Sequence, residues 1–218
     1  MRLIAPSILA ADFLNLGREI AFLNESADII HLDIMDGTQV PNISFGFSVV
    51  EPVAKIAQIP MDAHLMIVHP ENYFERLVKL GIQMISFHAE AVEREGESVI
   101  EFIKNLKAMG VKAGVAINPD YPIEKALEFV SEADYIVVMS VFAGFGGQKF
   151  IEATYDRVKA LKSRIRETGS ECLIQVDGGV GVGNIGTLEE AGVDMFVAGS
   201  SVFRGGNPPE AIKALREA

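Results

Sequence analysis

The sequence predicts an α/β fold in which residues 1–218 form a single (β/α)8 barrel. Short runs of apolar and β-branched residues alternate with segments of three-to-four-residue periodicity from end to end. Eight strand-and-helix units fit this alternation, at about 27 residues each, close to the lower size limit of such barrels. No linker, charge block or low-complexity segment interrupts them. A doubly wound open sheet is the alternative, but the even spacing and a final helix that reaches the terminus favour closure.

The chain thus divides into eight predicted strands, each followed by a predicted helix. The strands are expected at Leu3–Leu9, Ile29–Met35, Met61–Met66, Met84–His88, Lys112–Asn118, Tyr135–Val141, Cys172–Asp177 and Met195–Gly199. The helices are expected at Phe13–Asn24, Phe47–Ala57, Glu71–Leu80, Glu97–Met109, Ile123–Val130, Ile151–Thr168, Gly183–Ala191 and Pro209–Arg216. Glycines commonly end helices, and four of them follow these segments: Gly81, Gly110, Gly169 and Gly192.

Composition narrows the functional class. No apolar run approaches the roughly 20 residues that span a bilayer, and Met1–Ile4 leads into patterned sequence without a signal-peptide layout, so we expect a cytoplasmic protein. A net charge of −11 argues against nucleic acid or an anionic membrane as partner, because both bind clustered Lys and Arg. The single cysteine, Cys172, excludes an internal disulfide and a cysteine-cluster metal site, and we expect it in the core.

Polar residues gather at the carboxyl ends of the predicted strands, where barrel active sites lie. In the second strand, His31 and Asp33 project to the same side. A carboxylate buried beside a histidine is costly unless a metal, a hydrogen-bond network or proton transfer compensates. The other polar residues at these strand ends are Ser7, His64, His88, Glu90, Asn118, Ser140, Asp177, Gly199 and Ser200.

Two imidazoles and two carboxylates are therefore expected to converge at one mouth: His31, His64, Asp33 and Asp177. Such a donor set suits one divalent metal ion, Zn²⁺, Fe²⁺, Mn²⁺ or Co²⁺, better than Ca²⁺. His88 is given a lining role at most. Asn118, which precedes a proline, is expected mainly to form a turn.

Three glycine-rich segments indicate a phosphate site. Gly144–Gln148 follows the sixth predicted strand, Asp177–Val180 the seventh and Ala198–Ser201 the eighth. Glycine lets the backbone approach a ligand and expose N–H groups to an anion. None of the segments carries a Walker lysine or a dinucleotide fingerprint, so a phosphorylated metabolite is favoured over a nucleotide.

Seven motifs are spread along the chain: Ala5–Asp12, His31–Gly37, Val40–Gly46, Asp62–Met66, Gly144–Gln148, Val176–Val180 and Val197–Ser200. Through them the chain resembles the ribulose-phosphate 3-epimerase family over essentially its whole length. The resemblance implies a (β/α)8, or TIM, barrel that interconverts D-ribulose 5-phosphate and D-xylulose 5-phosphate in the pentose phosphate pathway. It also implies one bound divalent metal ion, and a homo-oligomer, since the family includes dimers and hexamers.

The resemblance also implies roles for individual residues. It makes His31, Asp33, His64 and Asp177 the metal ligands, with Asp33 and Asp177 also serving as the acid–base pair that acts through a metal-stabilised enediolate. Ser7 and His64 would contact the sugar. The phosphate would be held by Gly144, Phe145, Gly146, Gly147, Gly178, Gly179, Gly199 and Ser200. Family methionines that line the metal and the reacting carbon correspond to Met35, Met66 and Met139.

General chemistry favours the same pair of acids. Inverting a carbon beside a ketone requires that a proton leave one face and another arrive on the opposite face, which two carboxylates accomplish by exchanging the roles of base and acid. The sequence departs from the family pattern at Thr38–Gln39, where a basic residue or histidine and then an aromatic are common, and at Phe142–Ala143, where Asn-Pro is common. Both departures bear on sugar specificity.

Three other functions compete with this one. A sister epimerase of a hexulose 6-phosphate, such as D-allulose 6-phosphate, would need the same chemistry and a longer pocket. Related decarboxylases pair Asp with Lys in the second-strand motif, and a Schiff-base aldolase needs a strand-end lysine; neither lysine is found. A non-catalytic phosphate-binding barrel would bind ligand without exchanging protons.

Overall fold

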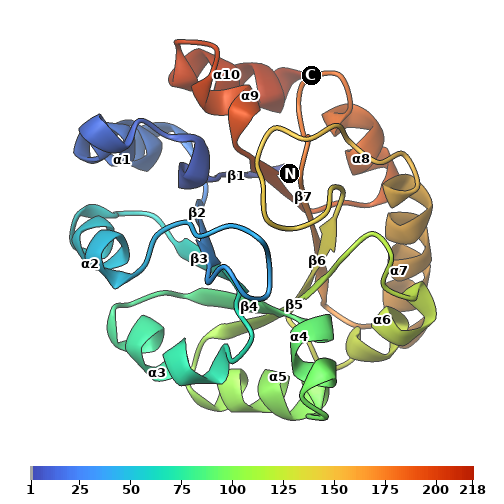
Figure 1. The fold of residues 1–218 in the computed structure, drawn as a ribbon. Coiled ribbons are helices and arrows are strands. Elements are labelled where there is room, and N and C mark those ends of the chain that lie inside the picture. Colours follow the sequence, from blue (N-terminus) through green and yellow to red (C-terminus); the bar gives the residue numbers. More distant parts are fainter. Residues whose placement is uncertain (1) are drawn as a thin grey trace.

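The computed structural model describes residues 2–218, so Met1 of the N-terminal segment lies outside the described residues. Eight parallel strands form one sheet in the order β1-β8-β7-β6-β5-β4-β3-β2, and the helices surround them (Figure 1). The prediction of a (β/α)8 barrel is confirmed. The strands are β1 (Leu3–Pro6), β2 (Ile30–Met35), β3 (Met61–Met66), β4 (Met84–His88), β5 (Lys112–Ile117), β6 (Tyr135–Met139), β7 (Leu173–Asp177) and β8 (Met195–Ala198).

The helices follow the strands around the outside of the barrel. They are α1 (Leu16–Ser26), α2 (Phe47–Ile56), α3 (Glu71–Lys79), α4 (Ala89–Arg94), α5 (Val99–Ala108), α6 (Ile123–Phe129), α7 (Thr154–Thr168), α8 (Ile185–Ala191), α9 (Ser200–Phe203) and α10 (Pro208–Glu217). Two short 3₁₀ helices, η1 (Ile8–Ala10) and η2 (Phe13–Asn15), precede α1. Among the described residues, no helix has the length and apolarity needed to cross a membrane.

Several predicted boundaries were wrong by a few residues. The first strand ends at Pro6 rather than Leu9, because the hydroxyl of Ser7 accepts the N–H of Leu9 and starts η1. The helix expected from Phe13 begins as η2 and becomes α-helical at Leu16. Helices α4 and α9 were not predicted, since each is too short to show a helical period. The four glycines expected at helix ends all have positive φ.

The barrel closes between β1 and β2 along a seam that extends toward the predicted site. The backbone carbonyl of Ile4 accepts the N–H groups of Asp28 and Ile29, and Ser7 forms an isolated parallel bridge with His31. The closing seam therefore runs directly into two residues that were singled out for function.

Strand alternation separates two apolar regions. In β6, Ile136 and Val138 pack outward against the helices, whereas Tyr135, Val137 and Met139 belong to the cluster inside the barrel. The same alternation in β2 and β3 sends polar side chains inward, where His31, Asp33, Asp62 and His64 are all buried. The interior thus holds buried polar side chains beside apolar ones, which allows a reactive site to form inside a folded core.

Cys172 lies in the core, as predicted. Its side chain is buried, and burial raises the pKa of the thiol to about 12. A thiol with so high a pKa carries almost no thiolate at neutral pH, so Cys172 is not a nucleophile.

We expect Gly114→Ala to destabilise the protein by about 1–3 kcal/mol, because overpacking a filled core has that cost. A Cβ at Gly114 of β5 would overlap the ring of Tyr135, whose hydroxyl donates to Asp62 Oδ1 at 2.7 Å. Urea unfolding measures the effect. The matched control is Gly17→Ala in α1, where no atom lies within 4 Å and alanine should stabilise by up to about 1 kcal/mol. Equal stability of the two variants would contradict the packing described here.

Candidate metal and acid–base site

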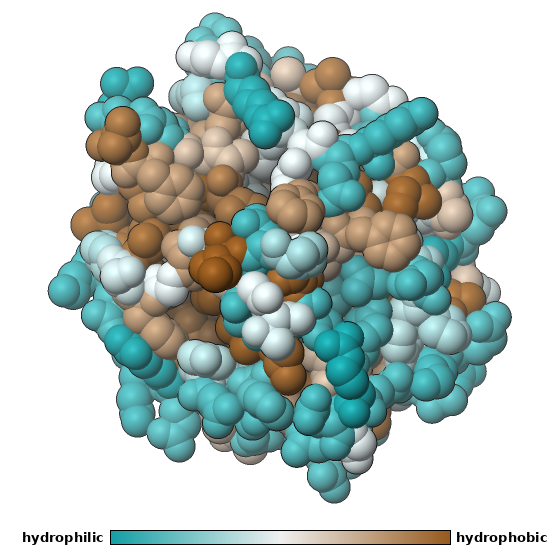
Figure 2. All heavy atoms as spheres, in the orientation of Figure 1, coloured by the Kyte–Doolittle hydropathy of each residue, from teal (hydrophilic) through white to brown (hydrophobic). Residues whose placement is uncertain are grey.

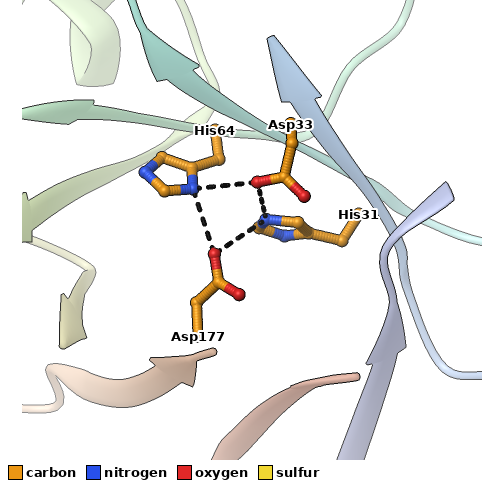
Figure 3. Close-up of side chains that lie close together, drawn as sticks. All are labelled: His31, Asp33, His64 and Asp177. Carbon is orange, nitrogen blue, oxygen red and sulfur yellow. Dashed lines mark ion pairs between the residues drawn. The ribbon is translucent and has the colours of Figure 1, made fainter. Parts of the chain in front are cut away.

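Four side chains meet at the carboxyl end of the barrel (Figure 3). His31 and Asp33 come from β2, His64 from β3 and Asp177 from the end of β7, and their donor atoms lie within 4.8 Å of one another. Nδ1 of His64 is 3.3 Å from Oδ1 of Asp33 and 3.3 Å from Oδ2 of Asp177. Nε2 of His31 is 3.3 Å from Oδ1 of Asp33. Residues far apart in the chain thus converge as expected.

Three of these donor atoms are buried without a hydrogen-bond partner: Nε2 of His31, Oδ1 of Asp33 and Nδ1 of His64. Buried polar atoms left unpaired are costly and rare in folded proteins. Here they share a centre with the Asp177 carboxylate. Two imidazole nitrogens and two carboxylate oxygens around one point are a donor set that divalent transition metals bind, so the residues fit such an ion.

His31 is held from behind by a buried carboxylate. Its Nδ1 lies 2.9 Å from Oδ2 of Asp62, which also accepts from Nε2 of Gln175 at 2.8 Å. The hydroxyl of Tyr135 donates to the other oxygen of Asp62. An ionised carboxylate only accepts, so Nδ1 of His31 keeps its proton and Nε2 is the nitrogen that would lose its proton to a metal and turn a lone pair to the centre. Metal-binding histidines are commonly oriented in this way.

Electrostatics at the centre favour positive charge. Burial lowers the pKa of His64, but the nearby carboxylates of Asp177 and Asp33 outweigh that effect and raise the pKa to about 8. Burial likewise opposes protonation of His31, yet Asp33 and Asp62 hold its pKa well above the usual value. The pKa of Asp33 is held far below its usual value by the two histidines, despite its burial. The carboxylates therefore attract a cation to this point.

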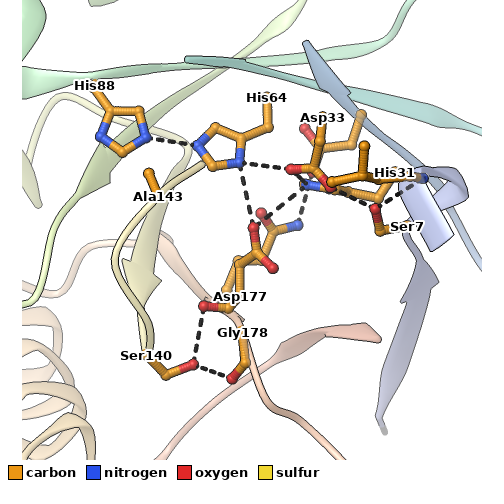
Figure 4. A network of polar contacts seen from close by, with 12 residues as sticks. Ser7, His31, Asp33, His64, His88, Ser140, Ala143, Asp177 and Gly178 are labelled. Atoms are coloured by element: carbon orange, nitrogen blue, oxygen red, sulfur yellow. Dashed lines mark hydrogen bonds and ion pairs between the residues drawn. The ribbon is translucent and has the colours of Figure 1, made fainter. Parts of the chain in front are cut away.

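A cavity of about 270 Å³ opens above the four residues. Asp33 and Asp177 line it, whereas His31 and His64 are fully buried beneath. The remaining predicted residues in its lining are Ser7, Gly144, Phe145, Gly146, Gly147, Gly178, Gly179, Gly199, Ser200, Met35, Met66 and Met139. His88 was expected at most to line the site; it is fully buried behind His64 instead, and its Nε2 lies 3.0 Å from Nε2 of that ring (Figure 4).

The glycine-rich segments surround one side of the cavity. Gly144, Gly147, Gly178 and Gly179 all have positive φ, and a Cβ at Gly178 would overlap Val141. Alanine or larger residues would therefore not be accommodated there. Arg204 lies against this side: a Cβ on Gly147 would be 3.0 Å from its Nη1. Among the described residues it is the only Lys or Arg that lines the cavity, and its guanidinium makes no hydrogen bond or ion pair with any of them.

Loops after β2 and β6 meet over the mouth. The side-chain amide of Asn42 donates to the carbonyl of Gly144 at 2.8 Å, and Gly144 approaches Val40 closely. Gln148 braces the second loop by donating to the carbonyls of Phe142 and Phe145. The two loops thus contact each other where they line the cavity.

Residues 3–203 match the model of the ribulose-phosphate 3 epimerase family. The chain is 41% identical to the ribulose-phosphate 3-epimerase of Mycobacterium tuberculosis strain H37Rv, over 98% of this chain and 91% of that one. It is 40% identical to the enzyme of the same name from Bacillus subtilis, over 98% of this chain and 97% of that one. The chain belongs to the ribulose-phosphate 3-epimerase family. It is therefore an isomerase, and the predicted resemblance is confirmed.

More distant solved structures share the fold. KGPDC from Streptococcus mutans superposes with a TM-score of 0.73 at 14% identity, covering 100% of this chain and 96% of its own. N-(5'-phosphoribosyl)anthranilate isomerase from Pyrococcus furiosus does so with a TM-score of 0.68 at 14% identity, covering 100% and 98%. At such identities the likeness shows only the barrel.

Sequence reasoning missed three contributors to the site of this family member. The support given by Asp62 depends on Tyr135 and Gln175, which lie on other strands. The contact between His88 and His64 depends on the pairing of β3 with β4. Arg204 follows α9, which was not predicted; the signal that could have found it is a lone cation a few residues beyond the last glycine segment.

We expect a divalent ion such as Zn²⁺ or Co²⁺ to raise the melting temperature of chelator-treated protein, because an ion that binds only the folded state stabilises it. Thermal unfolding with and without the ion measures this effect. Asp177→Asn should reduce the metal-induced shift, since it removes one carboxylate from the cluster. The control is His69→Ala, which alters a half-exposed histidine outside the cluster and should keep the full shift. A shift of the same size in all three proteins would contradict binding at this site.

Proposed function

We propose that the chain, acting as a single barrel domain over residues 1–218, epimerises C3 and so interconverts D-ribulose 5-phosphate and D-xylulose 5-phosphate. The observation that carries the proposal is the placement of Asp33 and Asp177 on different strands, each 3.3 Å from the same nitrogen of His64 and both lining the cavity. The names of the relatives support the substrate pair.

The two carboxylates divide the proton transfer between them. Asp33 comes from β2 and Asp177 from β7, so a flat enediolate in the cavity would have one carboxylate near each face. One removes the C3 proton as base while the other, protonated, returns a proton to the opposite face, and the reverse reaction exchanges the roles. The hydroxyl of Ser7 donates to Asp33 Oδ2 and orients that carboxylate.

One divalent ion would be held by Nε2 of His31, Nδ1 of His64 and one oxygen each of Asp33 and Asp177. The three unpartnered atoms among these four support the assignment. When bound, the ion supplies positive charge beside the substrate oxygen that becomes negative, which is a large contribution in a site that excludes water. The identity of the metal, among Zn²⁺, Fe²⁺, Mn²⁺ and Co²⁺, stays a prediction.

The phosphate would sit among the glycine-rich segments, with Arg204 beside it. Gly147, Gly179, Gly199 and Ser200 line the same part of the molecule as that guanidinium. The protein has a net charge of −11 and the cavity holds two aspartates, so a dianionic group needs compensation there. Backbone N–H groups and one unpaired guanidinium can provide it.

The surface around the cavity mouth bears on which molecules could bind the protein. Figure 2 shows apolar residues gathered over α1 and α2 on the side of the mouth, and the exposed large apolar side chains include Phe13, Leu14, Ile43 and Ile56. Such a face suits protein contact better than a nucleic acid or a membrane of anionic lipid. The homo-oligomer and the cytoplasmic location stay predictions. So does the choice between a pentulose and a hexulose phosphate, on which the half-exposed Phe142 bears.

Proton NMR of D-ribulose 5-phosphate in D₂O, with metal-loaded protein, tests the activity. We expect deuterium at C3 together with D-xylulose 5-phosphate. Asp33→Asn and Asp177→Asn should each lower kcat by roughly 10²–10⁴-fold, because neither amide can act as the general acid or base. Asp156→Asn, on the exposed face of α7, should not change kcat. Turnover of D-allulose 6-phosphate alone would favour the hexulose alternative, and folded, metal-loaded protein without exchange on either sugar would refute the proposal.

We expect Arg204→Gln to raise KM for the sugar phosphate about tenfold with little change in kcat, since a hydrogen bond to a charged group contributes about 1.5–3 kcal/mol. Steady-state kinetics at fixed ionic strength measure both constants. Arg18→Gln on α1 makes the same change of charge outside the cavity and should leave KM unaltered. An equal rise of KM in both variants would indicate a general electrostatic effect rather than a contact with phosphate.

A further inference from the structure

The cluster contains two histidines. His31 has a carboxylate directly behind it, and His64 does not. Its Nδ1 faces the centre, and its Nε2 lies 3.0 Å from Nε2 of His88 (Figure 4). The two rings are inclined by only 19°, which suits an N–H···N hydrogen bond in the plane of both. Such a bond has two possible directions, since each neutral imidazole is a donor at one nitrogen and an acceptor at the other.

The direction decides whether His64 can bind a metal. If His88 donates, Nε2 of His64 is the acceptor, and Nδ1 then carries a proton toward the centre. If His64 donates, its Nδ1 offers a lone pair to the centre. Only the second arrangement leaves Nδ1 free to be a ligand.

Glu90 determines which of the two directions the hydrogen bond between His88 and His64 takes. Nδ1 of His88 lies 3.3 Å from Oε2 of Glu90, at the start of α4. An ionised carboxylate accepts and never donates, so Nδ1 of His88 carries the proton. Nε2 of His88 is then an acceptor, and His64 donates to it through its own Nε2. Nδ1 of His64 is therefore the nitrogen that can release its proton and turn a lone pair to the cluster when a metal binds.

The Glu90 carboxylate is itself fixed. Its Oε1 accepts the backbone N–H of Asn118 at 2.7 Å, just beyond β5. Burial raises its pKa, but His88 and backbone N–H groups outweigh that effect and hold the pKa below the usual value, so the group is ionised at neutral pH. The side chain of Asn118 accepts from the N–H of Ala143, which connects this chain of contacts to the glycine-rich loop after β6.

We propose that Glu90 is a positioning residue that sets the direction of the Glu90–His88–His64 hydrogen bonds and so keeps Nδ1 of His64 available to the metal. The inference rests on the proposed metal centre. It concerns residues outside that centre and outside the cavity lining, since neither His88 nor Glu90 lines the cavity.

The proposal makes Glu90→Gln a specific test, because glutamine has nearly the same shape. The N–H of Asn118 still requires an acceptor, so the glutamine oxygen must take the place of Oε1. The glutamine NH₂ group then faces Nδ1 of His88 and donates to it. That reverses both hydrogen bonds, and Nδ1 of His64 becomes protonated toward the centre.

We expect metal-stripped Glu90→Gln protein to bind Zn²⁺ at least about tenfold more weakly than the unmodified chain, as measured by competition with a chromophoric chelator. Imidazole ¹⁵N NMR should also show the proton of His88 moved from Nδ1 to Nε2. The chain has four histidines, so the spectrum is simple. The control is Glu93→Gln, also on α4, whose carboxylate contacts Tyr121 and Lys125 rather than a histidine, and its Zn²⁺ affinity should be unchanged.

Each outcome of these measurements either supports or overturns the role proposed for Glu90. Weaker binding with reversed imidazole protons, in protein whose circular dichroism matches the unmodified chain, supports the proposal. Unchanged affinity and unchanged proton positions in Glu90→Gln overturn it while leaving the metal centre intact. If the unmodified chain itself fails to bind Zn²⁺, Co²⁺ or Mn²⁺ at the cluster, the metal centre proposed above fails, and this inference fails with it.

Discussion

The buried carboxylate of Asp62 is the constraint on which the rest of the site depends. It lies within the barrel with no exposed surface and accepts hydrogen bonds from three strands, through His31 of β2, Tyr135 of β6 and Gln175 of β7. A buried carboxylate is tolerated only when donors replace the water it has lost. The barrel interior must therefore keep its register, and that register also directs His31 toward the cluster.

Asp33 is a second buried carboxylate that needs a hydrogen-bond donor, and it obtains one at the seam where β1 meets β2. Ser7 bridges to His31 where β1 meets β2, and its hydroxyl binds Asp33. Closing the barrel thus satisfies one oxygen of Asp33 and leaves the other, Oδ1, unpaired beside both histidines. Among the described residues, the fold provides partners for Nδ1 of His31, Oδ2 of Asp33 and Nε2 of His64, and none for the three buried atoms of these side chains that face the centre. A cation at the centre would satisfy them, so stability and metal binding are linked through these atoms.

The sequence predicts those structural features that are determined by residues close together in the chain. Strand alternation and the rule that barrel sites lie at strand ends act within a few residues, which is why the barrel and the convergence of His31, Asp33, His64 and Asp177 were predicted. The support for these residues is not local. Asp62 meets Tyr135 and Gln175 across 73 and 113 residues of chain, and Glu90 meets the N–H of Asn118 across 28. No periodic pattern encodes such pairs, because their geometry exists only once the strands are in register.

The family commonly has Asn-Pro where this chain has Phe142–Ala143, and the difference changes which contacts hold the loop after β6. Proline at the second position would lack an N–H and would fix φ. Ala143 instead donates its N–H to Asn118, and its side chain packs against the small cluster of Met35, Val40 and Met66. A hydrogen bond and an apolar contact thus hold this position where proline would have fixed φ. The glycine-rich loop that lines the cavity is thereby connected through Asn118, Glu90 and His88 to His64.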